Sequence, residues 1–526
     1  MRDLLRTFTG PRLRASAVAA AVAIVLGGWV LAAPPGASPD DGYHLGSIWC
    51  GSGFKDGVCV EDLGSADDSR ALIPQTVTAI TCFTYDGSVS AACQFEALDT
   101  TFIQLVPSTT NLNRVRPNTY YRVMHTLIGD GQDVGAATAR IRTANATATV
   151  LLVLLTALLA DVRLRWAFLL SWLVAVVPLG LFLLTSVNTS AWGIAGLTTA
   201  WANALTVRDH PSRRNRLLAG ALMAVGLAMG LGSRTEAVAH VATIGVAIGA
   251  MVLLSLQERG RGTSGRVLGL TVRQIGLVAL TGAVALVGLL AIAPRSAGLG
   301  GLTRAFSRGY ARLDARDVGD PILAIAFEVP TLWAGALGNV WGLGALDTPI
   351  PSLASFPLMG VFVGLVVIGL HRGARARMAA VTLLLLFLFA VPTLSLLRDG
   401  LLVYEQLQPR QFMVLLFPLL GLALLRLPGE SPLEIGIAGR TAIVASLGIG
   451  HSVALLVTIQ RHTSGLLPGF LGEPRHVEFG REIEWWWASA PHPDVVWAIV
   501  SIAYVVLVAL VVQRFAPPAQ VAVRAD

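Results

Sequence analysis

The sequence predicts an all-α polytopic membrane protein of about 12 transmembrane helices, with a disulfide-bearing extracytoplasmic loop domain. The chain of 526 residues is 54% hydrophobic and only 13% charged. Its apolar stretches approach the roughly 20 residues that a helix needs to cross the hydrocarbon core of a bilayer. A long polar segment separates the first two stretches and contains all four cysteines.

The first predicted span, residues 15–33, follows a basic N-terminal segment and ends in small residues. A cleavable signal peptide has the same pattern. We favour a retained anchor, because a first span keeps every basic cluster on one side of the membrane. The other spans are predicted at about 146–160, 167–186, 191–207, 217–232, 238–256, 274–293, 354–370, 378–397, 411–427, 441–459 and 495–513.

The distribution of charge predicts the topology of these spans. Arginine clusters, among them Arg163 with Arg165 and Arg213 with Arg214, recur at every second connection between spans. The loop from Pro34 to Asn145 instead has twelve acidic and seven basic residues, a net charge of −5. Under the positive-inside rule the loop is extracytoplasmic and both termini are cytoplasmic. The overall charge of +7 is thus explained without nucleic-acid binding, since no basic face with interleaved aromatic residues is present.

The predicted organisation has five parts. These are a cytoplasmic N-terminus with the first span (1–33), the loop domain (34–145), spans 2–7 (146–293), an extracytoplasmic interfacial segment (294–353), and spans 8–12 with a cytoplasmic C-terminus (354–526). The apolar stretch 321–345 is placed on the membrane surface or partly in the outer leaflet. An additional span here would put the arginine clusters that follow it on the extracytoplasmic side of the membrane.

The cysteines of the loop, Cys50, Cys59, Cys82 and Cys93, are even in number and lie in the exported segment, which predicts two disulfides. Pairing of neighbours, Cys50 with Cys59 and Cys82 with Cys93, is the interpretation that we adopt among the three connectivities. Buried free thiols are the alternative. A zinc site is disfavoured, because neither pair has the close spacing of a structural site.

A paired carboxylate motif follows the first span, in the order Ser38-Pro39-Asp40-Asp41-Gly42-Tyr43-His44. An alcohol that attacks an activated sugar carbon must lose its proton, and a positioned aspartate can accept that proton. The competing interpretation is a turn or a helix cap, for which Pro, Asp and Gly are typical residues.

Several motifs along the chain resemble a bacterial membrane family known as domain of unknown function 2142. They are the Asp40–His44 element, Arg116–Tyr121, Asn188–Trp192, Trp341–Pro351 and Gln408–Phe412 with Pro418, in the order that the family shows. The chain departs from the family at Asp41, Thr189 and Gln411, where the family commonly has Glu, Pro and Tyr.

The resemblance implies a fold similar to the GT-C glycosyltransferases and the use of a polyprenyl-phosphate sugar. By this analogy Asp40 or Asp41 is catalytic and an external arginine binds the donor phosphate. Arg410 is the first candidate, Arg234 the second and Arg140 the third, although interfacial anchoring explains such arginines equally well. His44, Tyr120, Trp341 and Asp347 complete the substrate-binding candidates. Glu236 is expected not to pair with Arg234 unless the backbone there is a non-helical turn, because residues two apart do not share a helix face.

We therefore predict an inverting glycosyltransferase of the bacterial plasma (inner) membrane, whose partners are a polyprenyl-phosphate sugar donor, an envelope glycan or lipid acceptor, and membrane lipids. A divalent cation could bridge carboxylate and phosphate, but the motifs require neither a metal nor another cofactor. A flippase for a lipid-linked saccharide and a non-catalytic protein of envelope assembly are the alternatives.

Overall fold

The computed structural model is mostly helical and describes residues 11–65, 67, 69–99, 104–110, 112, 118–260, 299–316, 319–371, 373–468, 474–476, 485–487 and 490–515. Within these residues seven helices are long and apolar enough to cross a membrane. They are α7 (Val134–Leu159), α11 (Arg213–Ser233), α12 (Ala237–Gly260), α16 (Ser352–Leu370), α17 (Arg375–Asp399), α21 (Ile437–Thr463) and α22 (Pro493–Val512), which η3 (Gln513–Phe515) extends.

Shorter or broken helices account for most of the other predicted spans, so the count of about 12 is not confirmed. Three shorter apolar helices lie within α2 (Pro11–Leu31), in α15 (Pro321–Ala336), and in the run formed by α19 (Pro409–Phe412), η2 (Met413–Leu415) and α20 (Leu416–Leu424). The span expected at 167–186 is divided into α8 (Val162–Ala175) and α9 (Leu179–Leu184). Helix α10 (Ser190–Asp209) covers the span expected at 191–207. The span expected at 274–293 lies outside the described residues.

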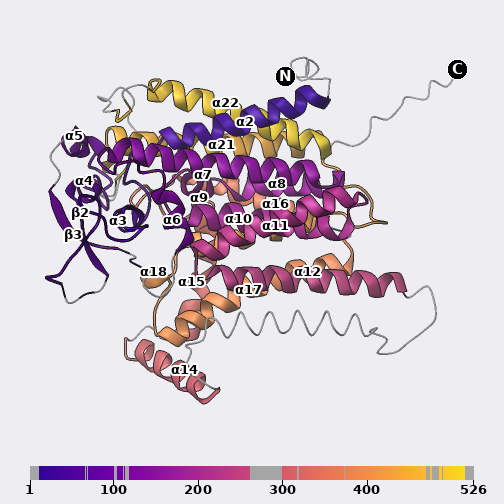
Figure 1. The fold of residues 1–526 in the computed structure, drawn as a ribbon. Helices are drawn as coiled ribbons and strands as arrows, with labels where there is room; N and C mark the ends of the chain where they lie inside the picture. Colours follow the sequence, from indigo (N-terminus) through magenta and orange to yellow (C-terminus); the bar gives the residue numbers. More distant parts are fainter. Residues whose placement is uncertain are drawn as a thin grey trace.

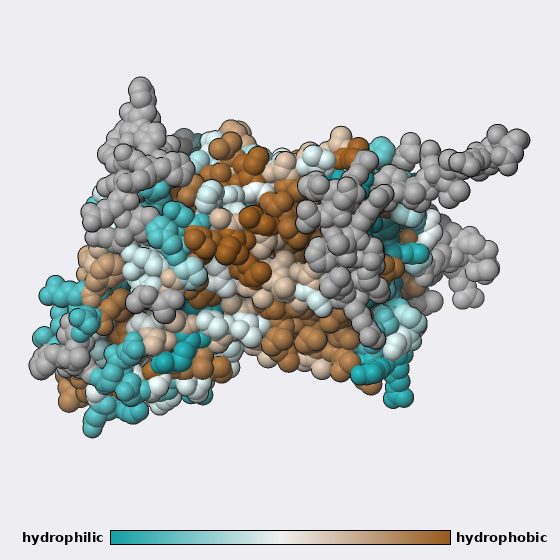
Figure 2. All heavy atoms as spheres, turned by 90° about the horizontal axis from the view of Figure 1, so that it is seen from above, coloured by the Kyte–Doolittle hydropathy of each residue, from teal (hydrophilic) through white to brown (hydrophobic). Residues whose placement is uncertain are grey.

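The helices pack side by side into one bundle. Figure 1 shows α2 alongside α7 and α22, with the loop domain gathered at one end. Tyr504 of α22 donates a hydrogen bond of 2.7 Å to the carbonyl of Leu173 in α8. Helices α10 and α11 approach most closely at Gly196 and Gly226, where a β-carbon on Gly196 would lie 2.2 Å from the carbonyl oxygen of Gly226. In Figure 2 a brown, apolar band crosses the middle of the described surface between hydrophilic ends.

The loop domain is not purely helical. Strands β1 (Val60–Glu61), β2 (Arg70–Pro74) and β3 (Leu105–Thr109) form an antiparallel sheet in that order. Around it lie α3 (Asp41–Trp49), α4 (Gln75–Ala79), η1 (Ala91–Gln94), α5 (Phe95–Asp99) and α6 (Thr119–His125). These elements share a small core of their own, in which Trp49 and Ile73 are fully buried. Disulfides join Cys50 to Cys59 and Cys82 to Cys93, which confirms the predicted pairing.

The remaining elements lie later in the chain: α14 (Leu299–Asp314), α18 (Val403–Gln406), and a small hairpin of β4 (Leu467–Pro468) and β5 (Pro474–His476). Helix α15 falls in the stretch expected at the membrane surface. It packs on α17, where the indole of Trp333 donates to the carbonyl of Leu388 at 3.1 Å.

The guanidinium of Arg461 in α21 attaches the loop domain to the bundle. It is completely buried and donates to the carbonyl oxygens of Phe83, Asp86 and Val89 at 2.6–2.9 Å. The same guanidinium forms an ion pair of 2.9 Å with Asp347. Three carbonyls and one carboxylate therefore compensate the cost of burying this charge. We refer to these contacts as the Arg461 latch.

Replacing Arg461 tests the latch. Arg461→Met removes the donor that the three carbonyls share and the counter-charge of the buried Asp347 carboxylate, so we expect it to lower the free energy of unfolding by about 3–5 kcal/mol. Arg461→Lys keeps the charge but offers fewer donors, and its effect should be intermediate. Thermal unfolding of the detergent-purified protein measures both changes.

The control is Arg316→Gln, which breaks the exposed ion pair that Arg316 forms with Glu405. Exposed pairs contribute little, so this variant should unfold close to wild type. Equal unfolding temperatures for Arg461→Met and wild type would contradict the latch.

Candidate functional site

Six polar side chains meet where the loop domain contacts the bundle, and we call them the polar cluster. They are Asp40 at the start of α3, His44 in α3, Tyr121 in α6, Arg234 and Glu236 between α11 and α12, and Arg410 in α19. Four of the predicted site residues, Asp40, His44, Arg234 and Arg410, are thus brought together from distant parts of the chain.

Asp40 faces into the polar cluster. Its backbone adopts the left-handed conformation with φ of 61°, just before α3 begins at Asp41. Its carboxylate forms an ion pair of 2.5 Å with the guanidinium of Arg410, and 48% of its side chain is exposed. Partial burial raises the pKa of Asp40, but the charge and hydrogen bond of Arg410 outweigh burial and hold that pKa below its ordinary value.

Asp41 plays a different part from its neighbour. It is buried, and its carboxylate accepts hydrogen bonds from the backbone N–H of Ser38, at 2.9 Å, and from the Ser38 hydroxyl. Burial raises the pKa of Asp41 to about 6. Asp41 therefore has the structural role in a turn that was the alternative to catalysis. Asp40 is the carboxylate that a ligand can reach.

Arg234 pairs with Glu236, which the sequence analysis allowed only for a non-helical backbone. Helix α11 ends at Ser233, and the backbone of Arg234 is extended, with φ of −138° and ψ of 135°. Thr235 and Glu236 then form a turn before α12, so the helix-face argument does not apply. The two side chains form an ion pair of 2.5 Å, and Arg234 also donates to the Thr189 hydroxyl at 3.4 Å.

His44 is held neutral beside these charges. Burial, with the nearby charges of Arg234 and Arg410, lowers the pKa of His44 to about 3. Its Nδ1 lies 2.8 Å from the hydroxyl of Tyr121. Its Nε2, like the Nε of Arg410, is buried and has no hydrogen-bond partner among the described residues. These two atoms can bind a ligand that enters the polar cluster.

The other predicted site residues lie outside the polar cluster. Arg140 donates to the carbonyls of Leu127 and Ile128, which places its charge on a turn of the loop domain. Tyr120 donates to the carbonyl of Val187 at 2.6 Å.

Two further candidates come from the Trp341–Pro351 motif. Trp341 stacks on Tyr404 with ring centroids 5.1 Å apart, and its indole N–H has no partner within the described part of the chain. Asp347 belongs to the Arg461 latch, and only 5% of its side chain is exposed. The structure therefore gives Asp347 a place in the attachment of the loop domain.

Two buried residues that were not among the predicted site residues support the segment before Asp40. Asn188 donates to the carbonyl of Pro39 at 2.8 Å. Arg142 donates to the carbonyls of Ala33 at 2.6 Å and Thr185 at 2.7 Å. Arg142 counted only as a loop charge in the sequence, but it lies in the third turn of α7. The signal in the sequence was Asp133, a typical helix-capping residue. A helix predicted from this cap onward would have placed Arg142 within α7.

A cavity of about 150 Å³ opens beside the polar cluster, between α12, α17 and α19, and is lined by Glu236, His240, Gln411 and Phe412 among others. Within the described ranges, no three His, Cys, Asp or Glu side chains come together as a potential metal site. Asp40 is already engaged by Arg410, so we derive no step through a divalent cation.

Comparison with known proteins gives one match. Residues 23–417 match a family model described as a predicted membrane protein (DUF2142). The match covers the polar cluster, the loop domain and the bundle as far as α20. Curated proteins and solved structures give no match.

The unequal environments of Asp40 and Asp41 predict different pH dependences of stability. The pKa of Asp41 is raised, so its contribution to stability is full below pH 4 and is lost as the pH rises through about 6. We expect Asp41→Asn to gain on the order of 3 kcal/mol relative to wild type between pH 4 and pH 7. Thermal unfolding in detergent at the two pH values measures this change.

Asp40→Asn is the matched control. The pKa of Asp40 is lowered, so its contribution is present above pH 4 and falls away only at lower pH. The difference between Asp40→Asn and wild type should therefore stay constant from pH 4 to pH 7. If the difference in stability between Asp41→Asn and wild type also stays constant over this pH range, burial does not raise the pKa of the Asp41 carboxyl.

Proposed function

We propose that this chain, which belongs to the DUF2142 family of predicted membrane proteins, is a membrane glycosyltransferase. It would transfer a sugar from a polyprenyl-phosphate donor to an extracytoplasmic glycan or lipid of the cell envelope. The observation that carries the proposal is the polar cluster, in which an accessible carboxylate and two arginines converge at one end of an apolar bundle.

The arginines suit a donor that carries a phosphate on a lipid. A guanidinium offers a planar set of donors that matches phosphate oxygens. Arg410 lies in α19, directly before the run of η2 and α20 that enters the bundle, and Arg234 directly follows the apolar helix α11. Both charges thus sit at the ends of membrane helices, where a lipid phosphate lies, while the polyprenyl chain stays in the apolar region.

The ion pair between Asp40 and Arg410 suggests how donor binding prepares the base. Arg410 holds the pKa of Asp40 down, and a phosphate that binds Arg410 competes with Asp40 for the same donors. When that competition weakens the ion pair, the desolvation of Asp40 is no longer offset and its pKa rises. Asp40 then becomes a stronger base with the donor in place.

The chemical step follows from this arrangement. The acceptor hydroxyl oxygen attacks the anomeric carbon from the face opposite the phosphate, and the carbon–oxygen bond to the phosphate breaks. The hydroxyl proton passes to Asp40, and the electron pair of the broken bond leaves with the lipid phosphate. Configuration at the sugar carbon is inverted. His44, neutral and next to Tyr121, can orient the acceptor through its unoccupied Nε2.

The orientation of the bundle supports an extracytoplasmic site. Helices α7, α10 and α16 run from the loop-domain end to the opposite end, where the first turns of the helices that follow them, α8, α11 and α17, contain arginines. These include Arg163, Arg165, Arg213, Arg214 and Arg375. Positive connections face the cytoplasm. The loop domain, its disulfides and the polar cluster would then face away from the cytoplasm, at the plasma membrane.

Paired aspartate variants test the assignment of the base. A general base contributes about 10²–10⁴-fold to a rate, so Asp40→Asn should slow sugar transfer by that factor without weakening donor binding. Asp41→Asn leaves the base in place and should slow transfer far less. The measurement is transfer of labelled sugar from a polyprenyl-phosphate donor in proteoliposomes.

Arg410→Lys completes the set. It keeps a positive charge but loses the planar donor set, so the donor KM should rise more than kcat falls. Full transfer by Asp40→Asn would reject Asp40 as the base. Movement of labelled lipid across the bilayer with no transfer by wild type would identify a flippase instead.

A further inference from the structure

A long groove runs between α21 and α22, which lie side by side in the bundle (Figure 1). Its volume is about 910 Å³, within the roughly 300–1,000 Å³ of pockets that bury small-molecule ligands. Arg440 and Val453 line it from α21, and at 1.5 Å per residue they are roughly 20 Å apart along that helix. One leaflet contributes about half of the 30 Å hydrocarbon core, so the groove is long enough for one acyl chain and part of a headgroup.

The groove lies toward the end of the bundle away from the loop domain. The last turn of α21 contains Arg461, which contacts the loop domain, so the first turns of α21 lie at the opposite end. In the orientation proposed above, this is the basic, cytoplasmic end. The groove therefore opens to the cytoplasmic leaflet.

The polar side chains of the groove gather at this end. Arg440 and Thr441 in the first turns of α21 lie near Gln513, which directly follows α22, because the N–H of Ile435 donates to the carbonyl of Phe515 at 2.7 Å. The remaining walls are almost entirely small or aliphatic side chains, namely Val444, Ala445, Gly448, Ile449, Val453, Val505, Ala509 and Val512, together with Ser452. A polar end next to a long apolar wall matches the division of a phospholipid into headgroup and acyl chain.

The positive charge of Arg440 is not neutralised by the protein. Its Nε is buried and has no hydrogen-bond partner, and within the described residues its side chain forms no ion pair. The first turn of α21 has no acidic residue, and no side chain caps its N–H groups. The start of a helix has a partial positive charge, so both Arg440 and the helix end favour an anion here.

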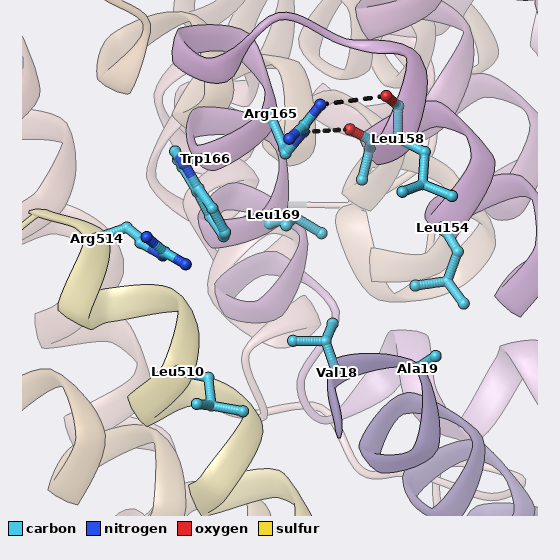
Figure 3. Close-up of a pocket in the computed structure, with 10 residues that line it drawn as sticks. Val18, Ala19, Leu154, Leu158, Arg165, Trp166, Leu169, Leu510 and Arg514 are labelled. Carbon is cyan, nitrogen blue, oxygen red and sulfur yellow. Dashed lines mark hydrogen bonds between the residues drawn. The ribbon is translucent and has the colours of Figure 1, made fainter. Parts of the chain in front are cut away.

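A smaller groove at the same end of the bundle shows the contrast. Figure 3 shows this groove, of about 270 Å³, between α2, α7, α8 and α22. Its Arg165 already donates to three backbone carbonyls at 2.6–3.2 Å, and its Arg514 lies over the ring of Trp166 at 5.1 Å. Both arginines are thus engaged within the protein, whereas Arg440 is not.

We propose that the groove between α21 and α22 binds an anionic phospholipid of the cytoplasmic leaflet. The phosphate contacts Arg440 and the start of α21, and one acyl chain lies along Ala445 and Ala509. Basic pockets between membrane helices on the cytoplasmic side bind anionic headgroups in this manner. Because the lipid binds the folded bundle, it stabilises the packing of α22 on α21.

A second copy of the chain fits the groove less well. Two copies in one membrane have the same orientation, so packing about a two-fold axis at this groove places both Arg440 side chains at the same depth. Like charges at one depth in an apolar contact repel each other, and within the described residues no acid pairs with Arg440 to offset this. A phospholipid instead supplies the opposite charge.

Native mass spectrometry of the full chain in detergent tests the proposal, with dioleoyl phosphatidylglycerol and dioleoyl phosphatidylcholine as probes. One arginine near the headgroup corresponds to about a fivefold preference for the anionic lipid. We expect wild type to bind phosphatidylglycerol at least that much more tightly. Arg440→Gln should remove most of the preference. Ala445→Phe, which fills the groove from an exposed position, should weaken the binding of both lipids.

Matched controls separate the groove from general surface effects. Arg375→Gln removes an exposed charge at the start of α17, and Ala442→Phe adds the same bulk at an exposed position of α21 outside the groove. Both should retain the wild-type preference and affinities. An unchanged preference in Arg440→Gln, unchanged affinities in Ala445→Phe, or equal affinity of wild type for the two lipids would each overturn the proposal. A wild-type dimer that Ala445→Phe dissociates would overturn it too, because a second copy would then occupy the groove.

Discussion

Buried arginines that donate to backbone carbonyls are the constraint on which the rest of the structure depends. A guanidinium in an apolar bundle is costly unless several acceptors surround it. Arg461 donates to carbonyls of the loop domain, and Arg142 donates to carbonyls that directly follow α2 and α9. Arg377, completely buried, does the same with the carbonyls of Gly369 and Ala423 and with Glu430. Arg461 and Arg142 in this way hold segments that have no regular structure of their own, and Arg377 joins the C-terminal ends of α16 and α20.

The polar cluster is a product of this arrangement. Asp40 and Arg410 are 370 residues apart in the chain, and their ion pair forms because the segment before α3 is held from both sides. Arg142 binds the carbonyls that precede it, and Asn188 binds the carbonyl next to Asp40. The left-handed backbone of Asp40 then turns its carboxylate away from Asp41 and toward Arg410. Rigid support of this kind is what a site needs in order to orient reacting groups.

The sequence predicted the helices better than it predicted how they end and meet. Apolar runs locate helices well, because the bilayer imposes their composition. They did not reveal that the stretch around Pro178 divides into α8 and α9, since both halves are equally apolar. The motifs pointed to Asp40, His44 and Arg410, and Arg234 was chosen as an external arginine for the donor phosphate. The motifs could not separate Asp40 from Asp41, because the two carboxylates differ in their contacts, with Ser38 for Asp41 and Arg410 for Asp40. The Arg234–Glu236 pair depends on a backbone that leaves the helix after Ser233.

The Arg461 latch has a consequence for biosynthesis. The carbonyl of Val89 and its donor Arg461 are separated by 372 residues. At roughly 5–20 residues per second, the ribosome needs on the order of 20–75 s to reach Arg461 after it has finished the loop. During that interval the segment from Cys82 to Cys93 lacks the guanidinium that binds its carbonyls, and within the described residues its own disulfide is the covalent cross-link that restrains it. A nascent chain arrested before α21 should thus present this segment to proteases and chaperones that no longer reach it once synthesis is complete.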